Sequence, residues 1–319
     1  MSWDNVPWFV GGGAQHSPEV ARLLAFAATS GAEGIVAPGD LKVLPLSVPG
    51  GSVRIAQGAS LVLNRATGGT SQTYVGRLPS EDVVEIAPTG SGAGRSDLIV
   101  VQVEDPFMAG EPWQAPIDPT VGPYIFTRVI PNVPAGTTSL QAVPGYSGRS
   151  AAVLARIDIP ASTGTITGAM ITDLRKLAQP REHRDVFMAG LSGSTQIIAS
   201  STEITDWPVY NVQVYVPTWA TRVDVITTVS GYLVTDALTD GIVRTVLGSL
   251  VGSSQTIDYD NPTGATRESV TLLCGAAIPA DMRGTTVTLK VQTDMNRGKL
   301  TARYNTQVVH DVNFYEKAV

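Results

Sequence analysis

The sequence has one cysteine, Cys274, and only three histidines, His16, His183 and His310. A single cysteine excludes a disulfide and a cluster of thiolate metal ligands within one chain. Cys274 follows an apolar run, Val-Thr-Leu-Leu, which predicts a small buried core residue. The three histidines are far apart, so only the fold could assemble a histidine metal site. We therefore expect no metal and no cofactor.

Charge is also scarce. Charged residues make up 16% of the chain, and the net charge is −6. Nucleic-acid-binding surfaces need clustered lysine and arginine, so this balance argues against a nucleic-acid partner. The sequence lacks the roughly 20 unbroken apolar residues of a membrane helix, and its start lacks the basic and apolar parts of a signal peptide. We expect a soluble protein, made in a cytoplasm, that does not insert into a membrane.

Catalytic motifs are absent as well. The sequence contains neither a Gly-x-Ser-x-Gly elbow nor a His-Glu-x-x-His pair. The carboxylates of Asp236, Asp240, Asp258 and Asp260 lie near predicted turns without a fixed spacing. The two carboxylates of a glycosidase are brought together by the fold and leave no linear motif. A glycosidase thus stays an alternative, but we expect no catalytic residues and no enzyme activity.

Glycine and proline are abundant, with 32 and 21 residues, whereas aromatic residues make up only 6%. Valine, threonine and serine recur throughout. Side chains branched at Cβ favour the pleated strand, while glycine and proline favour turns. The composition therefore predicts a mainly β fold of short strands and tight turns.

One helix is predicted, from about residue 18 to residue 29. Ser17 is a good N-cap, Pro18 suits the first helical position, and Gly31 can end the helix. Apolar residues recur at helical spacing and predict that the helix lies on a sheet through one stripe. The stripe consists of Val20, Leu23, Leu24 and Ala27.

A chain of 319 residues is long enough for two domains, each with its own core. Residues 178–185 are polar and densely charged and contain a proline, so we predict a linker there. It would separate an N-terminal β-rich domain with one helix, residues 1–177, from a C-terminal domain, residues 186–319. The second domain has about seven or eight alternating strand patterns and no helical one, which predicts a β-sandwich, either a jelly roll or an immunoglobulin-like fold.

Two Arg-x-Asp pairs flank apolar runs in the first domain. Arg95 and Asp97 precede Leu98–Val101, and Arg156 and Asp158 lie in a similar run. Residues two apart share one face of a strand, so each arginine can reach its aspartate. We interpret both pairs as structural clamps at strand ends.

Aromatic residues gather in two places. Trp3, Trp8 and Phe9 precede a Gly-Gly-Gly run, and we predict that they form an arm that docks on a neighbouring subunit or on their own domain. In the second domain, sugars could stack on exposed faces of Trp207, Trp219 and Tyr232. The alternative interpretation is that these three side chains belong to the sandwich core.

Several segments of the first 180 residues resemble the N-terminal region of minor tail or baseplate proteins of long-tailed, siphovirus-type bacteriophages. The resemblance rests on residues 19–35, 94–105, 133–138, 154–166 and 171–175. It implies attachment to the tail tip through this region, together with a distal β-rich module that is often trimeric and faces the host.

We therefore predict a structural protein of a phage tail tip, assembled in the host cytoplasm and located in the virion. Its expected partners are other tail-tip proteins and copies of itself, as a homotrimer. The alternative is a receptor-binding protein whose sandwich recognises a glycan of the host envelope. A wall-degrading enzyme is the third possibility.

Overall fold

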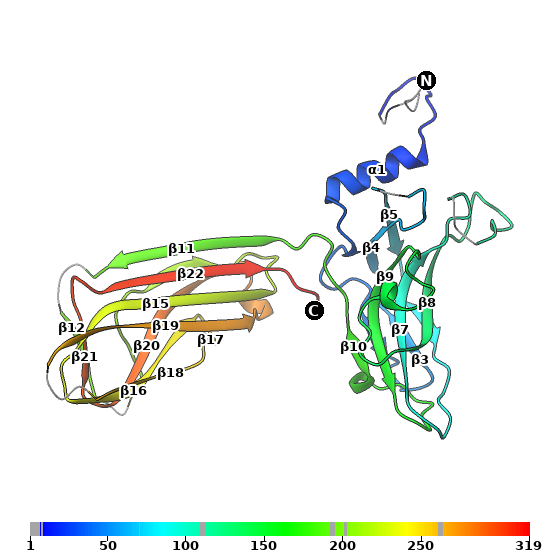
Figure 1. The fold of residues 1–319 in the computed structure, drawn as a ribbon. Helices are drawn as coiled ribbons and strands as arrows, with labels where there is room; N and C mark the ends of the chain where they lie inside the picture. The colour runs from blue at the N-terminus through cyan, green and yellow to red at the C-terminus, as the bar shows by residue number, and fades with distance from the viewer. Residues whose placement is uncertain are drawn as a thin grey trace. The chain divides into compact units, whose positions relative to one another are not determined.

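The computed structural model describes residues 7, 9–69, 71–108, 113–191, 195–200, 203–260 and 264–319. The chain divides into two compact units, residues 1–179 with 318–319 and residues 180–317. Both units consist mainly of antiparallel strands (Figure 1), and α1 is the one α-helix within these ranges. The prediction of a mainly β fold with a single N-terminal helix is confirmed.

The first unit contains helix α1 and three antiparallel sheets. The helix spans Pro18–Thr29. The first sheet has the order β1 (Gly34–Ile35), β4 (Gly58–Leu63), β5 (Thr73–Leu78). The second has the order β2 (Val43–Pro45), β3 (Ser52–Ile55), β6 (Asp82–Glu85). The third has the order β10 (Ile171–Asp173), β9 (Ala151–Ile159), β7 (Arg95–Val103), β8 (Ile125–Val133).

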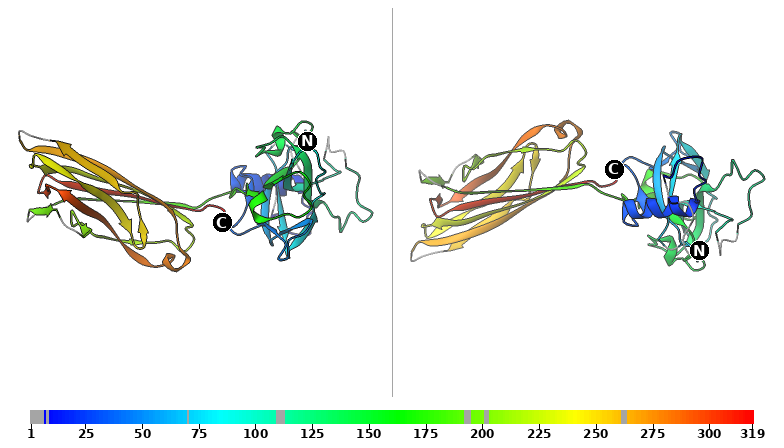
Figure 2. Two further views of the ribbon diagram at one scale, coloured as in Figure 1. Left: turned by 90° about the horizontal axis from the view of Figure 1, so that it is seen from below. Right: turned by 90° about the horizontal axis from the view of Figure 1, so that it is seen from above.

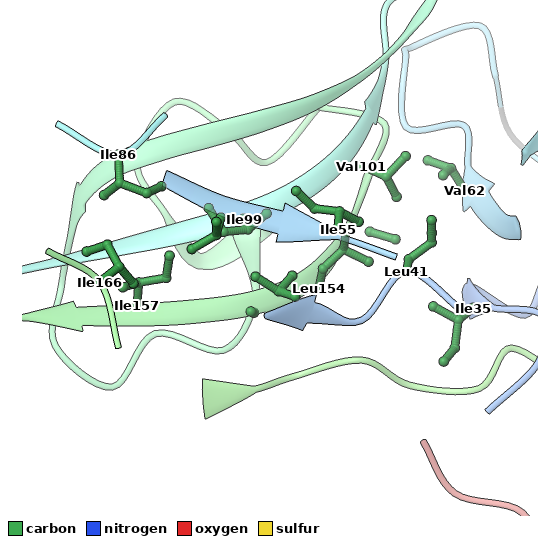
Figure 3. Close-up of a cluster of buried hydrophobic side chains, with 14 of the residues drawn as sticks. Ile35, Leu41, Ile55, Val62, Ile86, Ile99, Val101, Leu154, Ile157 and Ile166 are labelled. Atoms are coloured by element: carbon green, nitrogen blue, oxygen red, sulfur yellow. The ribbon is translucent and has the colours of Figure 1, made fainter. Parts of the chain in front are cut away.

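Strand β7 is buried on both faces because it lies between β9 and β8 and has apolar layers above and below. Successive side chains of a strand point to opposite faces. Ile99 and Val101 therefore enter the main core of the unit (Figure 3). Leu98 and Val100 enter a second core, which the segment around Leu140 completes.

Helix α1 begins as predicted. The backbone N–H of Glu19 donates to Ser17 Oγ at 3.1 Å, and Ser30 ends the helix in the left-handed conformation. The predicted apolar contact is wrong, because no helix residue is buried and Leu23 and Leu24 are 41% and 42% exposed. The helix is instead held through a polar side chain.

Arg22 makes that contact. Its Nε donates to Gln72 Oε1 at 2.6 Å, and its guanidinium lies 5.2 Å from the centre of the Tyr74 ring. Because Arg22 faces strand β5, the stripe that contains Leu23 and Leu24 turns away from the sheet. Helical periodicity located the stripe but could not decide which face of the helix meets the sheet.

The second unit contains two antiparallel sheets. One consists of β11 (Glu182–Gly190), β12 (Gln196–Ala199), β15 (Arg222–Val234), β19 (Thr266–Ala277), β21 (Lys299–Ala302) and β22 (Gln307–Tyr315). The other consists of β13 (Thr205–Asp206), β14 (Val212–Tyr215), β16 (Leu238–Leu247), β17 (Leu250–Val251), β18 (Gln255–Asp260) and β20 (Thr286–Arg297).

These strands have the order of a jelly roll. Four pairs of consecutive strands each run along one side of the same neighbouring strand or strand pair, so each counts as one interrupted strand. They are β11/β12, β13/β14, β17/β18 and β21/β22. The two sheets then have the orders 1-8-3-6 and 2-7-4-5, and side chains from both fill shared cores. This is the eight-stranded arrangement of two Greek keys. Figure 2 shows the sheets from two further sides.

The predicted linker 178–185 is partly wrong. Strand β11 begins at Glu182 and pairs with β22, so residues 182–185 belong to a sheet. Their charge density reflects the solvent-exposed edge of that sheet, where charged residues are common. The predicted boundary also misses Val319, which joins the first unit by accepting a hydrogen bond from Arg175 Nη2 at 2.7 Å.

Candidate interaction surface

The sheet formed by β11, β22, β15 and β19 has apolar side chains on both of its faces. On the inner face, Phe187, His310, Thr227 and Leu272 form one row across the four strands. One residue further along, Val186, Asp311, Ile226 and Leu273 form the next row, on the outer face. A parallel outer row contains Met188. Val186, Met188, Ile226 and Leu273 are here called the apolar outer stripe.

The apolar outer stripe is solvent-exposed. The exposed fractions of Val186, Met188, Ile226 and Leu273 are 59%, 70%, 44% and 59%. Val186 with Met188 and Ile226 with Leu273 are neighbours, and Asp311 lies between the two pairs. Exposed apolar residues grouped on a folded domain mark surfaces that another molecule covers. Solvated strands usually alternate apolar and polar residues, so this face differs from an ordinary solvent face.

The outer face of the opposite sheet has paired polar groups beside the exposed Tyr215, Leu238 and Val251. Arg244 Nη2 donates to Gln292 Oε1 at 3.0 Å, and Lys290 pairs with Asp206 at 3.0 Å. These groups satisfy one another and remain in contact with water. Exposed apolar side chains thus occur on both outer surfaces, and the stripe is the group in which four of them lie in two neighbouring rows of one sheet.

One ion pair lies within the apolar outer stripe. Arg184 Nε donates to Asp311 Oδ1 at 2.7 Å, and the hydrogen bonds from Arg184 hold the pKa of Asp311 below its usual range. The carboxylate is thus charged and neutralised by its neighbour. A covering molecule would meet no uncompensated charge at this position.

Beneath the stripe, a buried polar chain joins the two sheets. Thr227 Oγ1 is 2.8 Å from His310 Nδ1 and 2.9 Å from Thr245 Oγ1 on β16. Tyr210 stacks on the His310 ring with centroids 5.7 Å apart. Burial lowers the pKa of His310 to about 4, so the imidazole is neutral near pH 7. His310 is a core residue of the jelly roll.

Two of the three predicted glycan contacts are wrong. Trp207 and Tyr232 are 3% and 0% exposed and meet edge to face, with centroids 6.0 Å apart. The Tyr232 hydroxyl lies 2.7 Å from that of Tyr259, and burial raises the pKa of Tyr232. A sugar cannot reach either ring.

A β-bulge explains the position of Tyr232. Strand β15 buries Val225 and Val229 before the irregularity at Gly231, and it buries Tyr232 and Val234 after it. The extra residue reverses which side chains face the core. Strict alternation from Val225 predicts an outward Tyr232, so the bulge overturns that expectation.

Trp219 is half-buried against the core beneath it, and the Arg181 guanidinium lies 5.3 Å from the centre of its ring. It keeps an exposed part, and its role in glycan contact stays a prediction. Of the predicted docking arm, Trp3 and Trp8 lie outside the described residues. Phe9 is described and is 81% exposed.

The structure joins both Arg-x-Asp pairs. Arg95 binds Asp97 through two hydrogen bonds, of 2.8 and 2.9 Å, and the Asp97 carboxylate is fully buried. Arg156 Nε lies 3.0 Å from Asp158, which also accepts from Ser96 Oγ at 2.7 Å and so links β7 to β9. Both pairs hold strands of the third sheet.

Within the described ranges, no three or more His, Cys, Asp or Glu side chains are grouped closely enough to hold a metal ion. Cys274 is a buried core residue, and burial raises the pKa of its thiol. No helix in the described part of the chain is both long and apolar enough to span a membrane.

The apolar outer stripe was missed by the sequence reasoning, although the sequence contains a signal for it. Val225 is followed by Ile226, and Leu272 is followed by Leu273, so β15 and β19 have apolar residues on both faces at these positions. The sequence does not show that these positions lie in one row. Only the strand register does so.

The fold therefore defines a β-rich first unit and a jelly roll with an apolar outer stripe. No family model and no curated protein matches the chain. Among solved structures, it is similar to that of the infectious bursal disease virus Gx strain, with a TM-score of 0.26, 10% identity, and coverage of 90% of this chain and 76% of that chain.

The chain is also similar to T=1 particles derived from infectious bursal virus, with a TM-score of 0.23, 12% identity, and coverage of 95% of this chain and 81% of that chain. A third structure, BuGH86 in complex with neoagarooctaose, has a TM-score of 0.23 and 7% identity, covering 85% of this chain and 33% of that chain. TM-scores this low do not establish a common overall fold.

Proposed function

We propose that this protein is a structural component of a bacteriophage tail tip. In this proposal the first unit docks on other tail-tip proteins, and the jelly roll forms contacts between copies of the chain. The resemblance of the first 180 residues to minor tail proteins supports the location. The apolar outer stripe on the jelly roll is the observation that supports the interaction.

The stripe suits contact between copies because its chemistry is that of an interface core. Interface cores are depleted of unpaired charge and contain apolar side chains at their centre. The Arg184–Asp311 ion pair on this face is already neutralised. A homotrimer is the expected assembly, on the basis of the family resemblance.

Replacing the centre of the stripe should dissociate the assembly. Ile226→Asp and Leu273→Asp would each place a charge among apolar side chains of neighbouring copies. We expect either variant to weaken association at least tenfold, because burying an unpaired charge is costly. Sedimentation equilibrium of the full chain over a range of concentrations would measure this.

Val251→Asp is the matched control, since Val251 is 54% exposed on β17 of the opposite sheet. It should leave association unchanged, while circular dichroism verifies that all variants fold. A wild-type chain that stays monomeric at every concentration, or a Leu273→Asp variant with unchanged mass, would contradict the interface.

The location has its own test. Electron microscopy of the intact virion with an antibody against the jelly roll should show label at the end of the tail. Label on the capsid, or none on the virion, would contradict a tail-tip protein.

A second candidate function is recognition of a host envelope glycan through Trp219. The supporting observation is that Trp219 keeps an exposed part, unlike Trp207 and Tyr232. If this function holds, Trp219→Ala should lower binding of the full chain to host cells about tenfold, which corresponds to ~1.4 kcal/mol. Cell binding by flow cytometry would measure the loss.

Trp207→Phe would serve as the control, because this buried ring cannot contact a sugar. It should bind cells like the wild type. If the wild-type chain binds no host cells, the purely structural role is favoured.

A further inference from the structure

One face of β7 points away from the core that Figure 3 draws. Its residues change from apolar to polar along the strand. Leu98 and Val100 pack under the segment that contains Leu140. Gln102 follows on this face, and Glu104 comes just past the end of the strand; they are 3% and 7% exposed. A core would ordinarily continue with apolar residues here, since burying polar groups is costly. Polar residues are buried at this point instead.

These two residues line a cavity of about 220 Å³. The other side chains that the argument uses come from β8 and from two loops. They are Arg128, Trp113, Tyr146 and Arg149. The cavity thus combines charged, amide and aromatic groups on a rigid sheet, the composition typical of small binding sites.

The charges in the cavity do not cancel. Glu104 accepts from Arg128 Nε and Nη2, each at 3.0 Å, so those two charges neutralise each other. Arg149 forms no salt bridge within the described ranges. One positive charge therefore remains without a counter-charge.

Two buried hydrogen-bond donors on residues that line the cavity also lack an acceptor. The Arg149 guanidinium lies 4.7 Å from the centre of the Trp113 ring, so the two side chains are stacked. Arg149 Nη1 and Trp113 Nε1 are buried and have no partner in the part of the chain that is described. Buried donors without acceptors are rare, because the lost hydration is not replaced. Neither nitrogen is open to solvent where it lies, so a small movement of its side chain has to accompany an acceptor that satisfies it.

We propose that this cavity binds a carboxylate group, held by the guanidinium of Arg149 and the indole N–H of Trp113. A carboxylate is planar, accepts from a guanidinium fork and carries the one negative charge that balances Arg149. A phosphate would bring more negative charge close to Glu104 than one free cation can balance. The carboxylate can come from a small free acid or from an acidic side chain of a protein.

Nuclear magnetic resonance of the full chain with ¹⁵N-labelled tryptophan indoles would test the proposal. Trp113→Phe identifies the Trp113 signal among the five tryptophans. Titration with acetate should move that signal saturably, whereas acetamide and sodium chloride at equal concentration should not. Acetyl-glutamate-amide, compared with acetyl-glutamine-amide, then shows whether a protein side chain can also enter.

Arg149→Met should remove the acetate response or weaken binding at least tenfold. Arg149→Lys keeps the positive charge but loses the guanidinium fork, so we expect intermediate acetate affinity. This variant replaces Arg149→Met in the test if the methionine variant does not fold. Arg77→Met replaces an exposed arginine elsewhere in the unit and should leave the response unchanged.

Three results would overturn the proposal: no saturable shift with acetate, an equal shift with chloride, or undiminished binding by Arg149→Met. Binding of acetate without binding of the capped glutamate would support it with a small free acid as the source. Binding of both would extend it to acidic side chains of partner proteins.

Discussion

Asp97→Ala is expected to lower the free energy of unfolding of the first unit by about 3–5 kcal/mol, the usual cost of removing one partner from a buried ion pair. The Asp97 carboxylate is fully buried and accepts from Arg95 and from the backbone N–H of Asn132 at 2.9 Å. Alanine would leave the Asn132 N–H without this acceptor and would leave the Arg95 guanidinium with the Ala87 carbonyl oxygen alone. Asn132 has a φ of +57°, so the same carboxylate also holds a strained turn.

Asp158→Ala is the matched control, since it removes the aspartate of the other Arg-x-Asp pair. The Asp158 side chain is 45% exposed, and exposed ion pairs contribute only about 0–1 kcal/mol. Hydrogen exchange of peptides from β7 and β9 in increasing urea would measure both variants within this unit. If both variants lost the same free energy of unfolding, burial of Asp97 would not be the reason why its ion pair stabilises the unit.

The stability of the jelly roll is expected to fall by about 3 kcal/mol between pH 6.5 and pH 4 through His310 alone. Burial lowers the pKa of this imidazole from 6.5 to about 4 in the folded state. The unfolded chain therefore binds the proton more readily, and protonation favours unfolding. The contribution is fully present above about pH 6.5, declines as the pH falls, and levels off below the folded pKa.

His310→Gln would remove this pH-dependent part while keeping a polar side chain near Thr227. Urea unfolding followed by hydrogen exchange in β15 and β22, at several pH values, would give the difference between the variant and the wild type. His183→Gln is the control, because the His183 side chain is 51% exposed. If the free energy of unfolding of the wild type and of His310→Gln depended on pH in the same way, His310 would not be the source of the pH dependence.

The local features of the fold could be predicted from the sequence. Caps and proline position defined α1, and the spacing of Arg95 with Asp97 and of Arg156 with Asp158 predicted contacts that the structure contains. These features depend on residues that are neighbours in the chain. Backbone geometry alone brings them together.

Features that depend on distant residues could not be predicted in this way. The charges of residues 182–185 indicated a linker, but pairing with β22 makes them part of a strand. The bulge at Gly231 turned Tyr232 into the core, and Arg22 decided which face of α1 meets the first unit. In each case a partner far along the chain determined the outcome.

By itself, the sequence determined the strand-rich composition, the single helix and the short-range ion pairs, because hydrophobic periodicity, capping and two-residue spacing are local properties. Only the tertiary structure decided that the sandwich is a jelly roll, that Val186, Ile226 and Leu273 share one outer surface, and that Arg149, Trp113 and Glu104 line one cavity. Those arrangements follow from strand order and register, which the chain sets through contacts between residues far apart in sequence.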